Sequence, residues 1–580
     1  MKSRNRKGGR AGISARPADG RPNEAASAAL EVPEAGDSAH SGAAHSGAAQ
    51  EAVGGAGSDI FDRWFVPIAL GILLVAAAVR LPELALNPFH NDEGVNGFFT
   101  TNLVRNGTYT YDPTNYHGPS LYYFALVSEI LFGLTTEAMR LVPVVFGLLM
   151  VGLVFPLRPY LGSLAVLVAG GLLAISPGTV YVSRYFIHET LLVAFTLALV
   201  VAVRLYLDRR QATYLLAASV SAALLFTTKE TAVVTVGVLL IAVAVGQGYM
   251  RLRMPAAAGR PASGRAVPRT PRSVWIEGVE YRQAPVGGGA GGRRTAQRSL
   301  AIPGEHVAAA AIVFLVIYVL LYSSFFTNFP KGLVDSVAAY VYWFQHGEAT
   351  QVQPVYRYLQ WMIPADLAIL GLGLIGGLIA AIRARDRLWV VIGLWAAGIT
   401  AAYSMIQYKT PWIALNMLLP LALLGGLAVS ELWRSRRLRL GVPVVLAAAI
   451  LGSGYMTMDL NYNRYDDETY GYVFVHSTRD MLRLIDEIEA TAERAGTGQE
   501  TGIVFVTPDY WPLPWYFRDY PKAGFFGSIV ETEEAMIVAN VNQEAELASS
   551  IEGRYDRVDA FNLRPGVDLA LYVRNDIPKE

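Results

Sequence analysis

The sequence contains no cysteine and is poor in charge, with Asp, Glu, Lys and Arg at only 17% of positions. Without cysteine there are no disulfides, thiolate metal sites or cysteine nucleophiles. The formal net charge is zero, so no overall basic or acidic bias points to nucleic acid as a partner. The motifs GxxxxGK(S/T), HExxH and GxSxG and a dinucleotide fingerprint are not found in suitable contexts, which argues against soluble nucleotide-driven chemistry.

Apolar residues are abundant instead, at 53% of the chain. From Phe65 onward they form runs of roughly 17–25 residues, the length that crosses the hydrocarbon core of a bilayer. The sequence therefore predicts a multi-pass α-helical membrane protein. The apolar segments are 65–86, 120–134, 139–157, 161–175, 190–207, 214–228, 232–248, 306–325, 362–382, 388–405, 413–432 and 440–456.

The distribution of basic residues predicts the orientation in the cell membrane. The N-terminal tail begins with the basic stretch MKSRNRKGGR, which favours a cytoplasmic N-terminus. Four later loops are also basic, at 209–210, 251–298, 383–387 and 434–439. All four lie in the cytoplasm only if one early apolar segment does not cross the membrane. Of the two segments between residues 86 and 157, segment 120–134 is the shorter and contains Glu129, so we expect a re-entrant or interfacial helix there. About eleven crossings result, with the C-terminal part outside the cytoplasm.

This topology divides the chain into three parts. Residues 1–58 have no apolar core segment and are expected to form a disordered cytoplasmic tail rather than a signal peptide. Residues 460–580 are expected to form a small extracytoplasmic α/β domain, with helices at 478–495 and 542–551 and buried strands at 502–507 and 535–540. Between them lies the membrane domain, 59–459. It has outer loops at 87–119 and 326–361, and a flexible basic cytoplasmic loop at 250–304 suited to anionic lipid heads.

Ionisable residues gather at the predicted outer ends of the helices. The stretch FHNDEGV contains His90, Asp92 and Glu93 directly after the first apolar segment. Two carboxylates at a helix start often serve only the helix dipole, for about 0.3–1 kcal/mol each. The neighbouring histidine, the membrane surface and similar acidic stretches elsewhere favour a functional role.

Two further stretches carry paired ionisable groups. SRYFIHET places Arg184, His188 and Glu189 at a helix start, and a helical turn would bring the first two to one face. TTKET places Lys229 and Glu230 at another outer helix end. Both could simply terminate helices, but ionisable groups at membrane depth cost about 2.5–3.5 kcal/mol each and are usually functional.

Three single residues complete the set of candidates. Lys409 stands in QYKTPW, where its ammonium suits a phosphate group. His117 lies in NYHGPS and Arg140 in EAMRLVP, where it could equally be an ordinary helix-end cation. The aromatic stretch WPLPWYFRDY at 511–520 could stack on sugars, although plain packing is the favoured interpretation.

The order HNDE, SRYFIHE, TKE and KTPW, followed by WYFRDY, resembles the GT-C superfamily of integral-membrane glycosyltransferases. The similarity is to the protein O-mannosyltransferase and aminoarabinose-transferase type, and most to the prokaryotic flippase-activity-associated branch. It covers about residues 65–520. Relatives often carry Asp where this chain has Glu189, which leaves the role of that residue open.

The resemblance implies a polyprenyl-phosphate sugar as donor and a protein, lipid or glycan acceptor outside the cytoplasm. It also implies a general base in the first outer loop, here Asp92 or Glu93. The remaining candidates would bind the donor phosphate and substrate: His90, His117, Arg140, Arg184, His188, Glu189, Lys229, Glu230 and Lys409. A divalent cation, Mg²⁺ or Mn²⁺, between Asp92 and Glu189 is left open.

Two other functions compete with a transferase. A flippase component for lipid-linked sugars would use the same cations but requires alternating access, often with inverted repeats and broken mid-membrane helices. A membrane scaffold for the C-terminal domain would not require lysines and carboxylates at one face. The clustering of ionisable groups at the outer ends favours the transferase.

Overall fold

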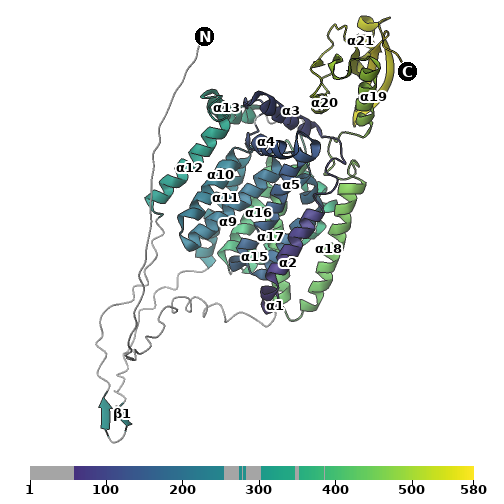
Figure 1. The fold of residues 1–580 in the computed structure, drawn as a ribbon. Coiled ribbons are helices and arrows are strands. Elements are labelled where there is room, and N and C mark those ends of the chain that lie inside the picture. The colour runs from purple at the N-terminus through teal and green to yellow at the C-terminus, as the bar shows by residue number, and fades with distance from the viewer. Residues whose placement is uncertain are drawn as a thin grey trace, which may run out of the picture. The chain divides into compact units, whose positions relative to one another are not determined.

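The computed structural model describes residues 58–115, 117–253, 273–276, 279–282, 302–346, 352–383 and 386–579. Nearly all of the predicted tail and most of the predicted loop at 250–304 lie outside the described residues. Helices dominate the described chain up to Met458 (Figure 1). Up to the loop, these are α1 (Ser58–Arg63), α2 (Phe65–Ala78), α3 (Asn91–Asn106), α4 (Ser120–Phe132), α5 (Thr136–Gly152), α6 (Arg158–Leu161), α7 (Ser163–Ile175), α8 (Pro177–Ser183), α9 (Glu189–Arg209), α10 (Ala212–Phe226) and α11 (Ala232–Arg253).

A short antiparallel hairpin, β1 (Ser273–Ile276) and β2 (Val279–Arg282), lies within the loop, and further helices follow it. They are α12 (Gly304–Tyr322), α13 (Lys331–His346), α14 (Arg357–Ala365), α15 (Leu367–Arg383), α16 (Arg387–Met405), α17 (Leu415–Arg434) and α18 (Val442–Met458).

The helices confirm a multi-pass membrane protein. Within the described ranges, seven helices are long and apolar enough to cross a membrane, or nine if each of two bent pairs forms one span. Shorter apolar helices are α2, α4 and α10. Eleven crossings result when α2 and α10 also cross and α4 does not; that number stays a prediction.

The innermost helix is α17, which is buried along nearly its whole length. Glycines allow its neighbours to approach closely. A Cβ at Gly376 of α15 would lie 1.8 Å from the carbonyl oxygen of Leu424, and one at Gly426 of α17 would lie 2.1 Å from that of Ala165. In contrast, α12 exposes large apolar side chains such as Ile312 and Leu315, as expected of a helix that faces lipid.

One predicted segment is broken, and another ends at a bend. The segment at 161–175 continues through a 60° bend into α8, and the segment at 362–382 bends by 114° between α14 and α15. The carboxylate of Asp366, at the second break, accepts hydrogen bonds from the Ser176 hydroxyl and the Gly178 N–H at the first. It also accepts one from the hydroxyl of Tyr472, at 2.7 Å. One carboxylate therefore satisfies polar groups at both breaks.

The C-terminal part has its own apolar cores, which begin at Met481. Its elements are α19 (Asp480–Arg494), β3 (Ile503–Phe505), α20 (Leu513–Tyr516), β4 (Ala523–Phe525), β5 (Met536–Asn540), α21 (Glu544–Ile551), β6 (Tyr555–Arg564) and β7 (Val567–Arg574). The sheet order is β4-β3-β5-β7-β6, with β4, β3 and β5 parallel and β7 antiparallel to its neighbours. This confirms both predicted strands and both predicted helices and adds three strands. A domain boundary at 460 stays a prediction, since Tyr470, Tyr472 and Val473 still pack with the membrane helices.

Replacing Gly376 by alanine should destabilise the protein, because the new methyl group meets the Leu424 carbonyl oxygen at 1.8 Å. Overpacking of this kind typically costs about 1–3 kcal/mol. The matched control is Gly371→Ala on the same helix, where a Cβ has no atom within 4 Å. The midpoint of thermal unfolding in lipid should fall for Gly376→Ala and remain or rise for Gly371→Ala; equal midpoints would contradict the close packing of α15 on α17.

Candidate functional site

The connection between α2 and α3 is held by a buried arginine. Arg140 of α5 donates hydrogen bonds to the backbone carbonyls of Leu84, Asn87 and Pro88. It also forms a two-pronged ion pair with Glu93, with Nε at 2.7 Å from Oε1 and Nη2 at 2.5 Å from Oε2. Since Glu93 is fully buried and Arg140 nearly so, the pair fixes the path of the chain into α3.

The first turn of α3 divides the predicted carboxylate pair into two environments. The Glu93 carboxylate accepts four hydrogen bonds, two from Arg140 and one each from the backbone N–H groups of His90 and Phe186. A carboxylate offers about four lone-pair sites, so Glu93 is saturated. Asp92, in contrast, is partly exposed and forms no ion pair within the described part of the chain.

His90 caps α3 at its N-terminus. Its Nδ1 accepts a hydrogen bond from the Asp92 N–H at 3.1 Å, so Nε2 carries the proton and donates to the Phe474 carbonyl oxygen. The imidazole therefore holds the backbone of Asp92 in place. It also packs edge-on against Trp412, with ring centroids 5.6 Å apart.

The expected helical turn from Arg184 to His188 is wrong. The helix α8 ends at Ser183 and α9 begins at Glu189, so the residues between them are not helical. Arg184 instead donates hydrogen bonds to the carbonyls of Arg80, Pro82 and Glu83. Buried carbonyls of an irregular segment require donors, and a guanidinium with its five N–H groups supplies several at once.

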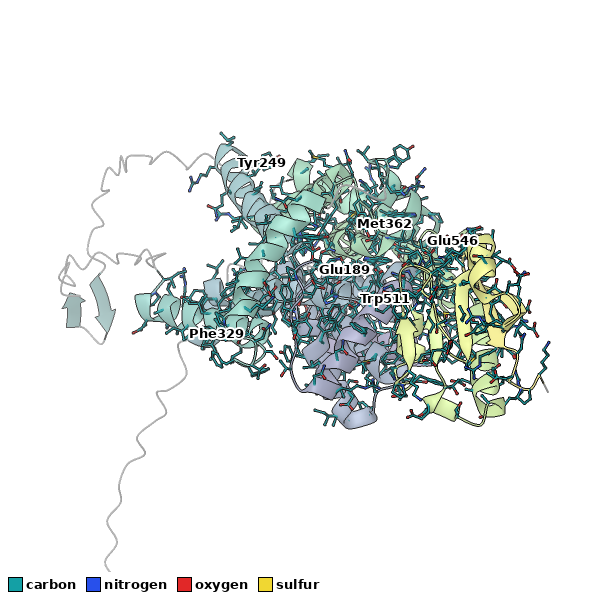
Figure 2. The ribbon with its side chains drawn as sticks, turned by 90° about the horizontal axis from the view of Figure 1, so that it is seen from above. Glu189, Tyr249, Phe329, Met362, Trp511 and Glu546 are labelled. Atoms are coloured by element: carbon teal, nitrogen blue, oxygen red, sulfur yellow. The ribbon has the colours of Figure 1, made fainter. Side chains whose placement is uncertain are left out.

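Five of the predicted residues meet in one cavity of about 190 Å³, which we call the α3–α9 pocket. They come from α3, from the segment before α4, and from the residues that precede or begin α9 and α11. Figure 2 shows Glu189 in the interior, among the helices. The lining residues are Asp92, Val95, Asn96, Thr114, Asn115, His117, Ile187, His188, Glu189, Lys229, Tyr408 and Trp412.

Lys229 and Glu189 form a buried ion pair in this pocket, with Nζ 2.8 Å from Oε2. Among the described residues this is the only hydrogen bond of the ammonium, which has three N–H donors. The second carboxylate oxygen, Oε1, is buried without a partner. The two charges of the Lys229–Glu189 pair therefore neutralise each other. Within the described ranges, two N–H donors of Lys229 and the Oε1 acceptor of Glu189 remain without a hydrogen-bond partner.

Two histidines lie beside this pair. The Nδ1 of His117 is 3.0 Å from Glu230, and its ring is 4.9 Å from that of His188. Burial, with smaller effects from His117 and the Lys229 ammonium, lowers the pKa of His188 well below its usual value. Burial alone would raise the pKa of Glu230, but the attraction and hydrogen bond of His117, together with the attraction of the Lys229 ammonium, outweigh burial, so this pKa is lowered. His188 is therefore neutral and Glu230 ionised at neutral pH.

Other predicted residues lie outside the lining. Lys409 is buried and donates to the Ile406 carbonyl oxygen, while Arg140, Arg184, Glu93 and His90 support the backbone around the pocket. No three His, Asp or Glu side chains in the described ranges converge as metal ligands, so we assign no metal.

The lining also contains polar and aromatic residues that were not predicted from the sequence, among them Asn96, Thr114, Asn115 and Tyr408. Asn96 could have been found, since it follows Asp92 by four residues on the same helix face. The side chain of Asn96 bridges the Phe186 carbonyl and the Tyr122 hydroxyl.

The stretch 511–520 packs against α3, as expected. Trp515 is buried and stacks on Phe89 with centroids 4.7 Å apart, and a Cβ on Gly97 would lie 2.6 Å from its ring. The Tyr516 hydroxyl accepts a hydrogen bond from the Phe89 N–H. This part of the C-terminal region thus contacts the residues directly before Asp92.

Comparison with known proteins supports the resemblance stated above. Residues 116–259 match the family of dolichyl-phosphate-mannose-protein mannosyltransferases. No curated protein matches the sequence. The fold is similar to that of ArnT from Cupriavidus metallidurans, with a TM-score of 0.57, 16% identity, and coverage of 87% of this chain and 97% of ArnT.

The same protein has been solved bound to undecaprenyl phosphate, and that structure matches with a TM-score of 0.55. The oligosaccharyltransferase of Archaeoglobus fulgidus, tethered to an acceptor peptide, matches with a TM-score of 0.50 and 13% identity, over 89% of this chain and 75% of that one. These similarities confirm the GT-C glycosyltransferase fold in a multi-pass membrane protein.

Removing one partner of the Arg140–Glu93 pair should destabilise the protein strongly. Arg140→Leu leaves the Glu93 charge buried and unpaired, which typically costs about 3–5 kcal/mol. The control is Arg105→Leu, which removes the half-exposed pair with Asp519 and should cost at most about 1 kcal/mol. Chemical unfolding in lipid or mild detergent measures both, and equal losses would show that Arg140 does not hold this region together.

Proposed function

We propose that the protein is a glycosyltransferase that moves a sugar from a polyprenyl-phosphate donor to an acceptor hydroxyl outside the cytoplasm. The observation that carries the proposal is the composition of the α3–α9 pocket. One cavity is lined both by Asp92, a carboxylate without an ion-pair partner in the described chain, and by Lys229, an ammonium with unused donors. The GT-C fold and the undecaprenyl phosphate bound by ArnT support the same conclusion.

Asp92 is the general base in this proposal. Its carboxylate takes the proton of the acceptor hydroxyl while that oxygen attacks the anomeric carbon of the donor. Glu93 is unsuited to this step because its four acceptor sites are occupied and it has no exposed surface. Glu93, His90 and Arg140 act as positioning residues, because they fix the first turn of α3.

The leaving group is the lipid phosphate, which departs with the electron pair of the broken carbon–oxygen bond. Lys229 offsets the negative charge that develops on the leaving oxygen, the kind of interaction that usually contributes most to catalysis. The free Oε1 of Glu189 is suited to accept a hydrogen bond from a sugar hydroxyl. Attack opposite the leaving group inverts the anomeric configuration in a single displacement.

Topology supports the direction of transfer. With a cytoplasmic N-terminus, the pocket opens on the outer side, where a flipped lipid-linked donor and an acceptor would meet. Arg184 and Lys409, two other expected phosphate ligands, do not line the α3–α9 pocket, and both donate to backbone carbonyls. We therefore assign phosphate binding to Lys229, next to His117 and the neutral His188.

A flippase component is the second candidate, because the breaks near Ser176 and Asp366 are a feature of transporters. The polar groups at these breaks, however, are hydrogen-bonded to one another and to Tyr472. Neither Ser176 nor Asp366 lines the α3–α9 pocket. The arrangement therefore favours transfer chemistry.

Replacing Asp92 by asparagine should lower turnover about 10²–10⁴-fold, the typical contribution of general-base catalysis, without weakening donor binding. The assay follows release of polyprenyl phosphate by the protein in lipid, with a panel of polyprenyl-phosphate sugars and a mixed acceptor extract. Asp559→Asn, an exposed carboxylate of the C-terminal part, is the control. Donor binding without release from any sugar, unchanged in Asp92→Asn, would favour the flippase.

Removing the Lys229 ammonium should weaken donor binding about tenfold or more, since hydrogen bonds to charged groups contribute about 1.5–3 kcal/mol. Lys229→Met alone leaves Glu189 buried and unpaired, so the double variant with Glu189→Gln is the main test. Binding of a fluorescent polyprenyl phosphate measures the effect, with the exposed Lys522→Met as control. Unchanged affinity in the folded double variant would remove Lys229 from the donor site.

A further inference from the structure

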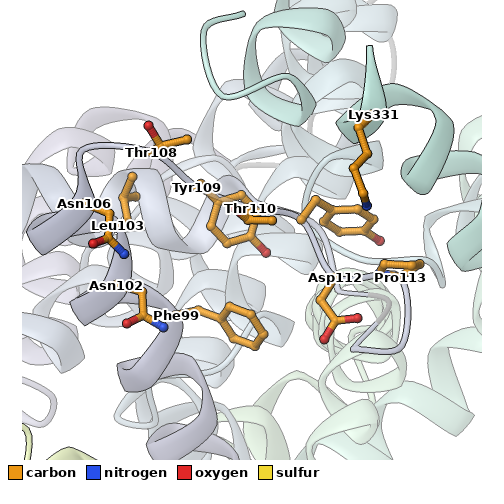
Figure 3. Close-up of a pocket in the computed structure, with 11 residues that line it drawn as sticks. Phe99, Asn102, Leu103, Asn106, Thr108, Tyr109, Thr110, Asp112, Pro113 and Lys331 are labelled. Carbon is orange, nitrogen blue, oxygen red and sulfur yellow. The ribbon is translucent and has the colours of Figure 1, made fainter. Parts of the chain in front are cut away.

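A second and larger cavity, of about 490 Å³, lies farther along α3. We call it the α3–α13 pocket. In Figure 3, Phe99, Asn102 and Asn106 line one side along a helix, and Lys331, the first residue of α13, approaches from another. The remaining lining comes from Leu103 and residues 108–113. Its volume falls within the range of about 300–1,000 Å³ that is typical of ligand sites.

The two pockets share one face of α3. Asp92, Val95 and Asn96 line the first pocket. Phe99, Asn102, Leu103 and Asn106 line the second at the same helical spacing of three and four residues. At 1.5 Å per residue, Asn102 lies about 15 Å from Asp92 along the helix axis.

The chain after α3 runs past both pockets as well. Residues 108–113 line the second, and Thr114, Asn115 and His117 line the first. The two pockets therefore neighbour each other along both α3 and the segment that follows it, with the proposed base in the first pocket. A ligand that fills both pockets must be extended.

The lining of the α3–α13 pocket is suited to an uncharged, hydroxyl-rich ligand. Both charged groups of the lining already have partners within the protein, because Lys331 pairs with Asp335 and the Asp112 carboxylate accepts hydrogen bonds from the N–H and hydroxyl of Thr114. The side-chain amides of Asn102 and Asn106 form no hydrogen bond with any described residue.

Aromatic residues complete the lining, with Phe99, Tyr109 and Tyr111 beside these amides. Amides that donate and accept hydrogen bonds next to apolar ring surfaces are what a sugar ring requires, whereas a lipid chain would leave the amides unsatisfied.

We propose that the α3–α13 pocket binds the distal sugars of an extended saccharide acceptor, whose terminal hydroxyl reaches Asp92. This rests on the proposed function and narrows its acceptor from protein, lipid or glycan to a glycan chain of several sugars. The first pocket, at about 190 Å³, holds the reacting groups, and the second selects acceptors by length.

The test measures saccharide binding to the full chain in lipid nanodiscs by saturation-transfer NMR and titration. The probes are gluco-, manno- and galacto-hexasaccharides, the matching monosaccharides, and a serine- and threonine-rich peptide. The variants are Asn102→Leu, Asn106→Leu and their combination. Gln499→Leu, which removes an exposed amide in the C-terminal part, is the matched control. Thermal unfolding midpoints establish that each variant is folded.

At least one hexasaccharide should bind more tightly than its monosaccharide, and the double variant should lose about tenfold in affinity, the effect of two hydrogen bonds. Gln499→Leu should bind as wild type. No binding by any hexasaccharide, or equal binding by the folded double variant, would overturn the proposal, as would binding of the peptide alone. Release of polyprenyl phosphate is measured separately, so hexasaccharide binding without release would count against the proposed function and not against this site.

Discussion

Burial of arginine among apolar helices is the constraint on which the site depends. A guanidinium in such surroundings must use its donors, and the irregular connection between α2 and α3 has backbone carbonyls that need them. Arg140 and Arg184 satisfy carbonyls of this connection, and Arg80 satisfies those at the end of α7. The ion pair of Arg140 with Glu93 then sets where α3 begins. Because Glu93 points into the protein interior toward Arg140, the preceding residue, Asp92, points into the α3–α9 pocket.

Much of the fold could be predicted from the sequence, because the membrane imposes a length on apolar segments. The short buried strands β3 and β5 and the helix α19 were equally visible as apolar patterns. The breaks near Ser176 and Asp366 were not, since they depend on hydrogen bonds between distant segments. The strand β6, YDRVDAFNLR, was not predicted because it is largely polar and buries only alternate residues near its end. The strand β7 contains the buried apolar run LALYV and could have been recognised from the sequence.

The site could be predicted in part. His117, His188, Glu189 and Lys229 lie together with Asp92, because each stands where a helix begins or ends at the same end of the bundle. The different environments of Asp92 and Glu93 could not be predicted from the sequence. They result from the ion pair of Glu93 with Arg140, which is 47 residues away in the chain. For Arg184 and Lys409 the sequence shows a cation, but it does not show that these side chains donate to backbone carbonyls and lie outside the lining of the pocket.

The carboxylate of Asp366 has a mechanical consequence. It joins the bend of α7 with α8, its own bend between α14 and α15, and Tyr472 on the segment that leads to the C-terminal part. Three segments of the chain are thus hydrogen-bonded to one carboxylate. They are also closely packed at Gly178, where a Cβ would lie 2.4 Å from the Tyr472 ring. Tension on the stem of the C-terminal part is therefore transmitted directly to α8, whose far end leads through His188 to the pocket.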